Sequence, residues 1–211
     1  METSAIASLL GPFINLDESR LRSISTYIDL LLKWNARINL TAIREPNEIV
    51  QRHFGESLFA AKYLLEQKQP QTAIDLGSGA GFPGVPFAML APDVQVTLIE
   101  AQQKKATFLR ELVRVLDMEK IKVFDQRAEN YPGTADLVML RAVEKFEEAL
   151  KMGIKLTKPG GTVALMIGSG QVELADKLSS EVGWGEPVQV PCSNSRALLV
   201  GVKSDKVELN T

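Results

Sequence analysis

Cysteine and histidine are almost absent from this chain of 211 residues, which contains one of each, Cys192 and His53. One cysteine cannot form an intramolecular disulfide, and the two residues cannot supply the ligands of a Cys/His zinc site. The chain also lacks an apolar run of about 18 residues, the minimum for a membrane-spanning helix, and a basic N-terminal leader. We therefore expect a cytoplasmic protein with no metal and no membrane segment.

An excess of positive charge is missing as well. The 24 lysines and arginines are outnumbered by 26 aspartates and glutamates, which gives a formal net charge of −2. Proteins that bind nucleic acid mainly through charge are usually basic overall. The balance argues against a free-standing nucleic-acid binder, although it permits a local basic patch.

The chain divides into two parts at the polar segment 67–71, QKQPQ. Before it, apolar residues at helical spacing predict a helix over 17–34 with Asp17 as its N-cap, and a second helix that begins at Pro46 and has Gly55 as a candidate break. After it, strands alternate with helices. The expected strands are 72–76, 94–99, 121–125, 136–140 and 162–167, and the expected helices are 84–91, 102–116, 143–156 and 171–181.

This alternation predicts a parallel sheet covered on both faces. Two last apolar runs, 187–192 and 197–203, have no helix between them and predict an antiparallel hairpin at the edge of the sheet. We therefore expect an N-terminal helical extension over residues 1–70 and an α/β domain over residues 71–211.

A glycine-rich loop follows the first expected strand in the segment 72–84, TAIDLGSGAGFPG. Gly79, Gly81 and Gly84 fit the pattern GxGxxG, and Glu100 ends the next strand. The same layout binds dinucleotides, with the acidic residue on the ribose hydroxyls. Four glycines after a carboxylate exceed what a tight turn demands. The pattern indicates a nucleoside-type ligand and leaves its identity open.

Two features favour a ligand other than NAD. Asp75 stands directly before the loop, where a carboxylate suits the ammonium group of an amino-acid-like ligand, and a dinucleotide fold has no need of the terminal hairpin. Together with Glu100, these features resemble class I S-adenosylmethionine-dependent methyltransferases. The resemblance implies a Rossmann-like, mostly parallel seven-stranded sheet with an antiparallel C-terminal hairpin. It also implies that the glycine loop packs on the methionine part of the cofactor and that Glu100 binds the ribose.

Further candidates stand at strand ends, where open α/β sheets bind ligands. Arg141 directly follows the strand DLVML, and its cation would face a ligand or a substrate phosphate; alternatively it pairs with Glu144 or Glu147. Ala128 and Glu129 follow the strand 121–125, in a loop suited to line an adenine or, alternatively, to form an ordinary charged turn.

The N-terminal part carries a separate signal in KWNARINLT, followed by Arg44 and His53. Exposed beside Arg37 and Arg44, asparagines could contact base edges or phosphates; buried, each would need several hydrogen-bond partners. The two candidates are Asn35 and Asn39. A lone histidine such as His53 is equally compatible with a structural role.

These motifs, taken together, resemble the bacterial glucose-inhibited division protein B family. The resemblance extends over nearly the whole chain, through KWN-x-x-INLT-x-x-R, H-x-x-x-S, D-x-G-x-G-x-G-x-PG, LIE…K-x-x-FL, R-A-E and RAV. It implies methyl transfer from S-adenosylmethionine to N7 of a guanine in the decoding-region loop of 16S ribosomal RNA, within the small subunit or an assembly intermediate. The residues that it places on the cofactor are Gly77, Phe82, Ala128, Glu129 and Arg141, beside Asp75, Gly79 and Glu100.

The chain departs from the family pattern at two positions. Glu56 stands where the family usually has aspartate, and Ile167 stands where a lysine commonly precedes Gly168. If that lysine contacts RNA phosphate, this chain must use another cation, such as Lys158 or Arg196.

Guanine N7 is an unprotonated acceptor, so its methylation needs no general base, and we predict no proton-transfer catalyst. The hypothesis assigns guanine positioning to Asn39, His53 and Arg141, and RNA binding to Arg37, Asn39, Arg44 and Arg196. It treats the protein as a monomer. The alternatives are a methyltransferase for another RNA base or a small molecule, an NAD-dependent oxidoreductase, and a non-enzymatic ribosome-assembly factor.

Overall fold

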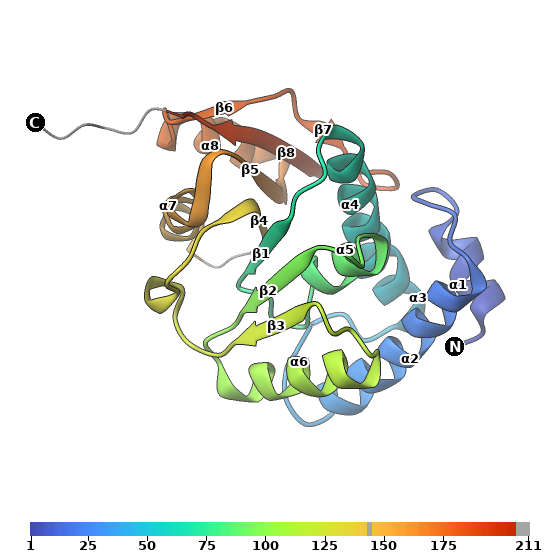
Figure 1. Cartoon of the computed structure of the whole chain (residues 1–211). Coiled ribbons are helices and arrows are strands. Elements are labelled where there is room, and N and C mark those ends of the chain that lie inside the picture. The colour runs from blue at the N-terminus through green and yellow to red at the C-terminus, as the bar shows by residue number, and fades with distance from the viewer. Residues whose placement is uncertain (143–144, 206–211) are drawn as a thin grey trace, which may run out of the picture.

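The computed structural model describes residues 1–142 and 145–205 (Figure 1). Its centre is one twisted sheet in which the first five strands run parallel in the order β3-β2-β1-β4-β5. β8 lies antiparallel to β5, and both β6 and β7 pair with the far side of β8. The strands are β1 (Thr72–Leu76), β2 (Gln95–Ile99), β3 (Ile121–Phe124), β4 (Ala135–Arg141), β5 (Thr157–Gly168), β6 (Val182–Trp184), β7 (Val188–Gln189) and β8 (Arg196–Lys203).

Helices cover both faces of this sheet (Figure 1). The first face packs against the N-terminal helices together with α5 and α6, and the second face packs against α7 and α8. Successive strand residues alternate between the two cores, because neighbouring side chains of a strand point to opposite faces. The helices are α1 (Thr3–Leu10), α2 (Glu18–Asn35), α3 (Pro46–Glu48), η1 (Ile49–Gly55), α4 (Glu56–Gln67), α5 (Gly84–Leu90), α6 (Gln103–Val115), η2 (Ala128–Asn130), α7 (Phe146–Leu156), η3 (Ser169–Gln171) and α8 (Val172–Leu178).

The N-terminal helices share one hydrophobic core with the first face of the sheet. Tyr27 of α2 illustrates the connection. Its ring is fully buried and stacks on Phe82 with 5.2 Å between the ring centroids, and its hydroxyl donates to the carbonyl of Ala80 in the glycine loop. The helical extension therefore supports the glycine loop directly. The domain boundary between residues 70 and 71 stays a prediction.

The expected parallel strands are confirmed. The helix capped by Asp17 is also confirmed, since the Asp17 side chain accepts from the backbone N–H of Arg20 at 2.9 Å. The class I arrangement is also confirmed. The sheet has seven positions across its width, and β6 and β7 both occupy the last one, beside β8. The sequence analysis missed β6, and its hairpin strand 187–192 shortens to the two residues of β7.

Three helical segments differ from expectation. The unpredicted helix α1 buries Ile6 and Leu10 against the first core. The helix from Pro46 continues without a break, through the π-helical turn η1 into α4. Gly55 serves packing instead, because a Cβ there would lie 2.7 Å from the ring of Phe13. Helix α7 begins at Phe146, and the expected positions 143–144 lie outside the described residues.

No helix among the described residues is long and apolar enough to span a membrane.

Candidate functional site

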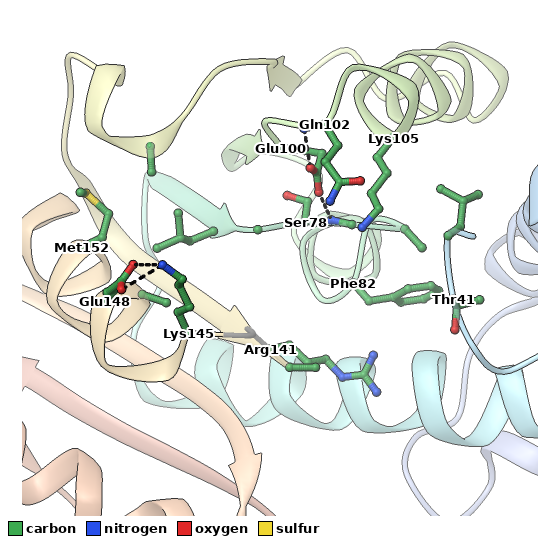
Figure 2. A pocket seen from close by; sticks show the side chains of 18 of the residues that line it. Thr41, Ser78, Phe82, Glu100, Gln102, Lys105, Arg141, Lys145, Glu148 and Met152 are labelled. Atoms are coloured by element: carbon green, nitrogen blue, oxygen red, sulfur yellow. Dashed lines mark hydrogen bonds and ion pairs between the residues drawn. The ribbon is translucent and has the colours of Figure 1, made fainter. Parts of the chain in front are cut away.

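A cavity of about 530 Å³ lies at the carboxyl ends of the parallel strands, with walls from both parts of the chain (Figure 2). The sheet domain contributes the glycine loop, Glu100 and the ends of β1 and β4. The N-terminal part contributes Leu40, Thr41 and His53. The predicted cofactor residues on its wall are Gly77, Gly79, Phe82, Glu100, Ala128, Glu129 and Arg141.

The glycine loop is held open by its own backbone. Gly77, Gly79 and Gly81 have φ values of 75°, 56° and 92°, a region that residues with a Cβ rarely adopt. The N–H groups of Gly77 and Ser78 both donate to the carbonyl of Ile99, each at 3.0 Å. The loop is therefore attached to the end of β2, and its residues Gly77–Ala80 form part of the cavity wall.

Glu100 is fixed at the base of this loop. Its Oε2 accepts from the N–H of Gly79 at 3.0 Å, and its Oε1 accepts from the N–H of Gln102 at 2.8 Å. The side chain is buried yet lines the cavity. Each carboxylate oxygen can accept a further hydrogen bond, so Glu100 can accept from donors of a ligand in the cavity, and its predicted contact with the ribose stays a prediction.

Asp75 lies behind the loop and is absent from the cavity wall, unlike the other predicted cofactor residues. Its Oδ2 accepts from the N–H of Gly84 at 2.9 Å, and its Oδ1 has no partner among the described residues. Complete burial raises the pKa of this carboxyl to about 7, although the Gly84 hydrogen bond opposes the rise. The structure thus gives Asp75 a place in holding the loop, and the predicted ligand contact stays a prediction.

Arg141 crosses from the end of β4 to the N-terminal helices. Its Nη2 lies 2.9 Å from Oε2 of Glu56 and also donates to the carbonyl of Arg52. Both charged side chains are less than one tenth exposed. Arg141 thus forms an ion pair, as the alternative prediction stated, but its partner is Glu56 and not Glu147. Glu144, the other predicted partner, lies outside the described residues.

His53 stands between Arg141 and Thr41. Its Nδ1 lies 2.9 Å from Nη1 of Arg141, and its Nε2 lies 2.7 Å from Oγ1 of Thr41. Its ring stacks on Phe82 with 4.8 Å between centroids. Burial, reinforced by the charges of Arg141 and Arg52, lowers the pKa of His53 to about 3. The imidazole is therefore neutral at physiological pH.

The asparagines of the N-terminal motif separate in the structure. Asn35 is buried, and its amide makes three hydrogen bonds to the backbone of Leu40 and Thr41, between 2.8 and 3.1 Å long. Asn39 is exposed, with Nη2 of Arg44 3.5 Å from its side-chain oxygen. Asn35 thus shapes the loop over residues 36–45. Asn39 and Arg44 lie on its exposed side, away from the cavity wall.

The predicted RNA-binding arginines do not gather at one point. Arg37 is exposed on the same loop as Arg44. Arg196 lies at the start of β8, opposite Gly168, close enough for its charge to lower the pKa of Arg141. Lys158 lies at the amino-terminal ends of the strands, 2.7 Å from Asp136, and is thus a poor substitute for a lysine beside the cavity.

Several cavity residues went unassigned in the sequence analysis. Thr41 and Lys105 belonged to recognised motifs, INLT and K-x-x-FL, whereas Lys145 carried no motif signal. Figure 2 shows Thr41 and Phe82 at one end of the cavity and Met152 at the other. The unassigned wall residues include Thr41, Gln102, Lys105, Lys145 and Met152. Within residues 1–142 and 145–205, no three His, Cys, Asp or Glu side chains gather as a possible metal site.

Over residues 20–196, the chain matches the family model described as rRNA small subunit methyltransferase G. The chain belongs to this family. Relatives named "Ribosomal RNA small subunit methyltransferase G" support the assignment. The protein from Roseiflexus castenholzii is 37% identical over 204 residues, covering 90% of this chain and 86% of the relative. The protein from Xanthomonas campestris pv. campestris is 36% identical over 195 residues, covering 90% of each.

Solved structures confirm the fold. A SAM-dependent methyltransferase from Aquifex aeolicus has a TM-score of 0.58 and 16% identity, covering 75% of this chain and 94% of that one. P. horikoshii TYW2 in complex with MeSAdo has a TM-score of 0.59 and 16% identity, covering 73% of this chain and 63% of that one. The family model and the named relatives confirm the predicted family and enzyme class, so the chain is a methyltransferase and not an NAD-dependent oxidoreductase.

The raised pKa of Asp75 predicts a pH-dependent stability. An aspartate ionises near pH 4 in the unfolded chain and near pH 7 in the folded protein, so the folded state binds more protons between these values. The free energy of unfolding then falls as pH rises from about 4 to 7, by about 1 kcal/mol per unit. In Asp75→Asn this contribution is absent. Urea unfolding at pH 5 and pH 7 should show the shallower pH dependence in Asp75→Asn, whereas the exposed Asp93→Asn should follow the wild type. Equal slopes for Asp75→Asn and wild type would refute the assignment.

The buried ion pair predicts a large stability loss on removal of one partner. In Glu56→Gln, the guanidinium of Arg141 would remain buried without its counter-charge, a change that costs about 3–5 kcal/mol in proteins. Glu48→Gln is the matched control, because Glu48 forms an exposed pair with Arg52 at 3.4 Å and should cost less than about 1 kcal/mol. Chemical denaturation measures both. Similar losses in the two variants would show that the buried pair contributes no more to the free energy of unfolding than the exposed pair.

Proposed function

We propose that this protein transfers a methyl group from S-adenosylmethionine to N7 of a guanine in the decoding-region loop of 16S ribosomal RNA. One observation carries the proposal beyond the family assignment: a single cavity joins the glycine loop and Glu100 to the N-terminal residues Thr41 and His53. A cofactor held by the sheet domain would therefore meet a substrate held by the N-terminal part.

The residues on the cavity wall fit S-adenosylmethionine. Glu100 offers two oriented oxygens for the ribose hydroxyls. At Gly79 an added Cβ would meet only the carbonyl of Gly77, 3.8 Å away, so the space beside this loop is open to a ligand. Ala128 and Glu129 stand on η2 at the same cavity, where they would line the adenine. When bound, the cofactor supplies an electrophilic methyl group on a sulfonium.

The reaction asks the protein for alignment. N7 of guanine carries a lone pair and no proton, so no base has to remove one before attack. His53 agrees with this requirement, because its pKa is near 3 and the lone pair of Nδ1 faces Arg141. Holding the reacting atoms in line can contribute about 7–11 kcal/mol in favourable cases. His53 and Arg141 belong in this scheme to substrate placement at the cavity, and the exposed Asn39 would position the RNA from outside the cavity wall.

RNA binding is assigned in this proposal to three cations, of which Arg37 and Arg44 are exposed and Arg196 is half-buried. Arg37 and Arg44 flank Asn39 on the loop 36–45, and Arg196 lies near Arg141. The net charge of the protein is −2, so charge alone would hold naked RNA poorly. The substrate that fits better is a structured ribonucleoprotein. The proposed partner is 16S rRNA within the small subunit or an assembly intermediate. A monomeric, cytoplasmic protein completes the proposal.

Gly79→Asp tests the cofactor assignment. A side chain at this position would enter the open space beside Glu100, and its negative charge would add to that of the glutamate. Isothermal calorimetry should find that binding of S-adenosylmethionine is lost. Gly170→Asp is the control, since its Cβ would meet nothing within 4 Å and Gly170 is absent from the cavity wall; it should bind as the wild type does. An unchanged dissociation constant for Gly79→Asp would exclude this loop as the cofactor site.

The substrate is tested by mapping the methylated nucleotide after incubation of unmodified small subunits with labelled S-adenosylmethionine. We expect label at N7 of one guanine of 16S rRNA, and much slower transfer to protein-free 16S rRNA. Label on another base would favour the alternative methyltransferase. RNA binding without any transfer would favour a non-enzymatic assembly factor. Equal rates on subunits and free RNA would refute the ribonucleoprotein preference alone.

A further inference from the structure

Four side chains form a continuous chain of hydrogen bonds from a buried carboxylate to the cavity wall. Arg141 donates to Glu56 over 2.9 Å, and its Nη1 lies 2.9 Å from Nδ1 of His53. Nε2 of His53 lies 2.7 Å from Oγ1 of Thr41, which lines the cavity. The chain of bonds therefore links the counter-ion of Arg141 to a hydroxyl group at the site.

The direction of every bond in this chain is fixed by chemistry. A guanidinium has only donors, so Nδ1 of His53 must accept from Arg141. The ring is neutral, because burial lowers the pKa of His53 to about 3, and its one proton must then be on Nε2. His53 therefore donates to Thr41, and Thr41 accepts.

Thr41 consequently faces the cavity as a donor. A hydroxyl oxygen has two lone pairs and one hydrogen. Oγ1 accepts from Nε2 of His53 and also from the N–H of Ile43 at 3.1 Å, which fills both lone pairs. The remaining hydrogen has no acceptor among the residues that the structure describes. Asn35 fixes the Thr41 backbone through bonds of 3.1 and 3.0 Å, so the position of the hydroxyl is set by the fold.

We propose that the Thr41 hydroxyl donates a hydrogen bond to O6 of the target guanine and so selects guanine over adenine. This inference rests on the proposed function. O6 is an acceptor beside N7 on the same base edge, whereas adenine presents an amino donor there. A hydroxyl whose lone pairs are both occupied pairs with O6 and cannot accept from that amino group. Thr41 is thus a specificity-determining residue.

The location of Thr41 favours the substrate over the cofactor as the acceptor. Thr41 belongs to the loop 36–45, which carries the exposed Asn39 and Arg44, and not to the glycine loop. Figure 2 shows it beside Phe82 at one end of the cavity, with Met152 at the other end and with Glu100 and Gln102 along one side. The carboxylate of S-adenosylmethionine is the competing acceptor, and the experiment separates the two.

The test combines two enzyme variants with two substrates. Thr41→Val removes the hydroxyl at nearly equal volume, and Thr41→Ser retains it. The substrates are small subunits reconstituted with 16S rRNA that carries either guanine or 2-aminopurine at the mapped target. 2-Aminopurine keeps N7 and lacks O6. On guanine, Thr41→Val should lose about tenfold in kcat/KM, as expected when a buried acceptor is left unpaired, and Thr41→Ser should stay within about twofold of the wild type.

The decisive result is the loss of additivity. The wild type should be slower on 2-aminopurine by about tenfold, and Thr41→Val should add no further loss on that substrate. Affinity for S-adenosylmethionine, measured by calorimetry, should be unchanged in both variants. An equal Thr41→Val loss on both substrates, or no loss on guanine, would overturn the inference while the proposed function stands. Weakened cofactor binding in Thr41→Val would assign the hydroxyl to the cofactor. Absence of transfer to guanine by the wild type would overturn both proposals.

Discussion

The buried ion pair between Glu56 and Arg141 is the constraint on which the site depends. An isolated guanidinium in the interior would be strongly unfavourable, so the end of β4 must meet a carboxylate from another element. That carboxylate comes from the first turn of α4, at the junction with the π-helical turn η1. The pair thus joins the sheet domain to the N-terminal helices at the cavity itself. It also fixes the tautomer of His53, because Arg141 leaves Nδ1 no role except acceptor.

The shared hydrophobic core gives this ion pair a rigid frame. Tyr27, Phe82 and His53 stack in succession, with centroid separations of 5.2 and 4.8 Å, from the middle of α2 to the cavity. The Tyr27 hydroxyl donates to a carbonyl of the glycine loop. The glycine loop and the proposed substrate-binding segment are distant in sequence, and one packed layer positions both of them. Closely packed interiors of this kind have low compressibility and keep side chains in fixed rotamers.

The features that the sequence predicted correctly are those that depend on neighbouring residues. Strand ends, the glycine loop, Glu100 and the N-cap at Asp17 depend on residues close together in the chain, and the structure places them as expected. Long-range pairing was less accessible. The alternative to a ligand contact for Arg141 was an ion pair with Glu144 or Glu147, but its partner, Glu56, lies 85 positions away in the sequence. The position of Asp75 in the motif revealed neither its complete burial nor its bond to the N–H of Gly84, and its predicted ligand contact stays a prediction. The edge strand β6 was missed because it has only three residues, and the predicted strand 187–192 is reduced to the two residues of β7.

A site that needs no general base can use its buried polar groups for recognition. In this protein the lone pair on Nδ1 of His53 accepts from Arg141, and the proton on Nε2 is donated to Thr41. The ring therefore has no free nitrogen for proton transfer. Because both ring nitrogens are hydrogen-bonded, the neutral imidazole holds Thr41 in a fixed orientation. It cannot rotate or change charge near physiological pH without breaking a buried contact. The direction of the Thr41 hydroxyl is then a consequence of Glu56, which three hydrogen bonds, through Arg141 and His53, connect to Thr41. Discrimination between purines would follow from the fold in advance of substrate binding, with no cost for reorienting the hydroxyl when the base arrives.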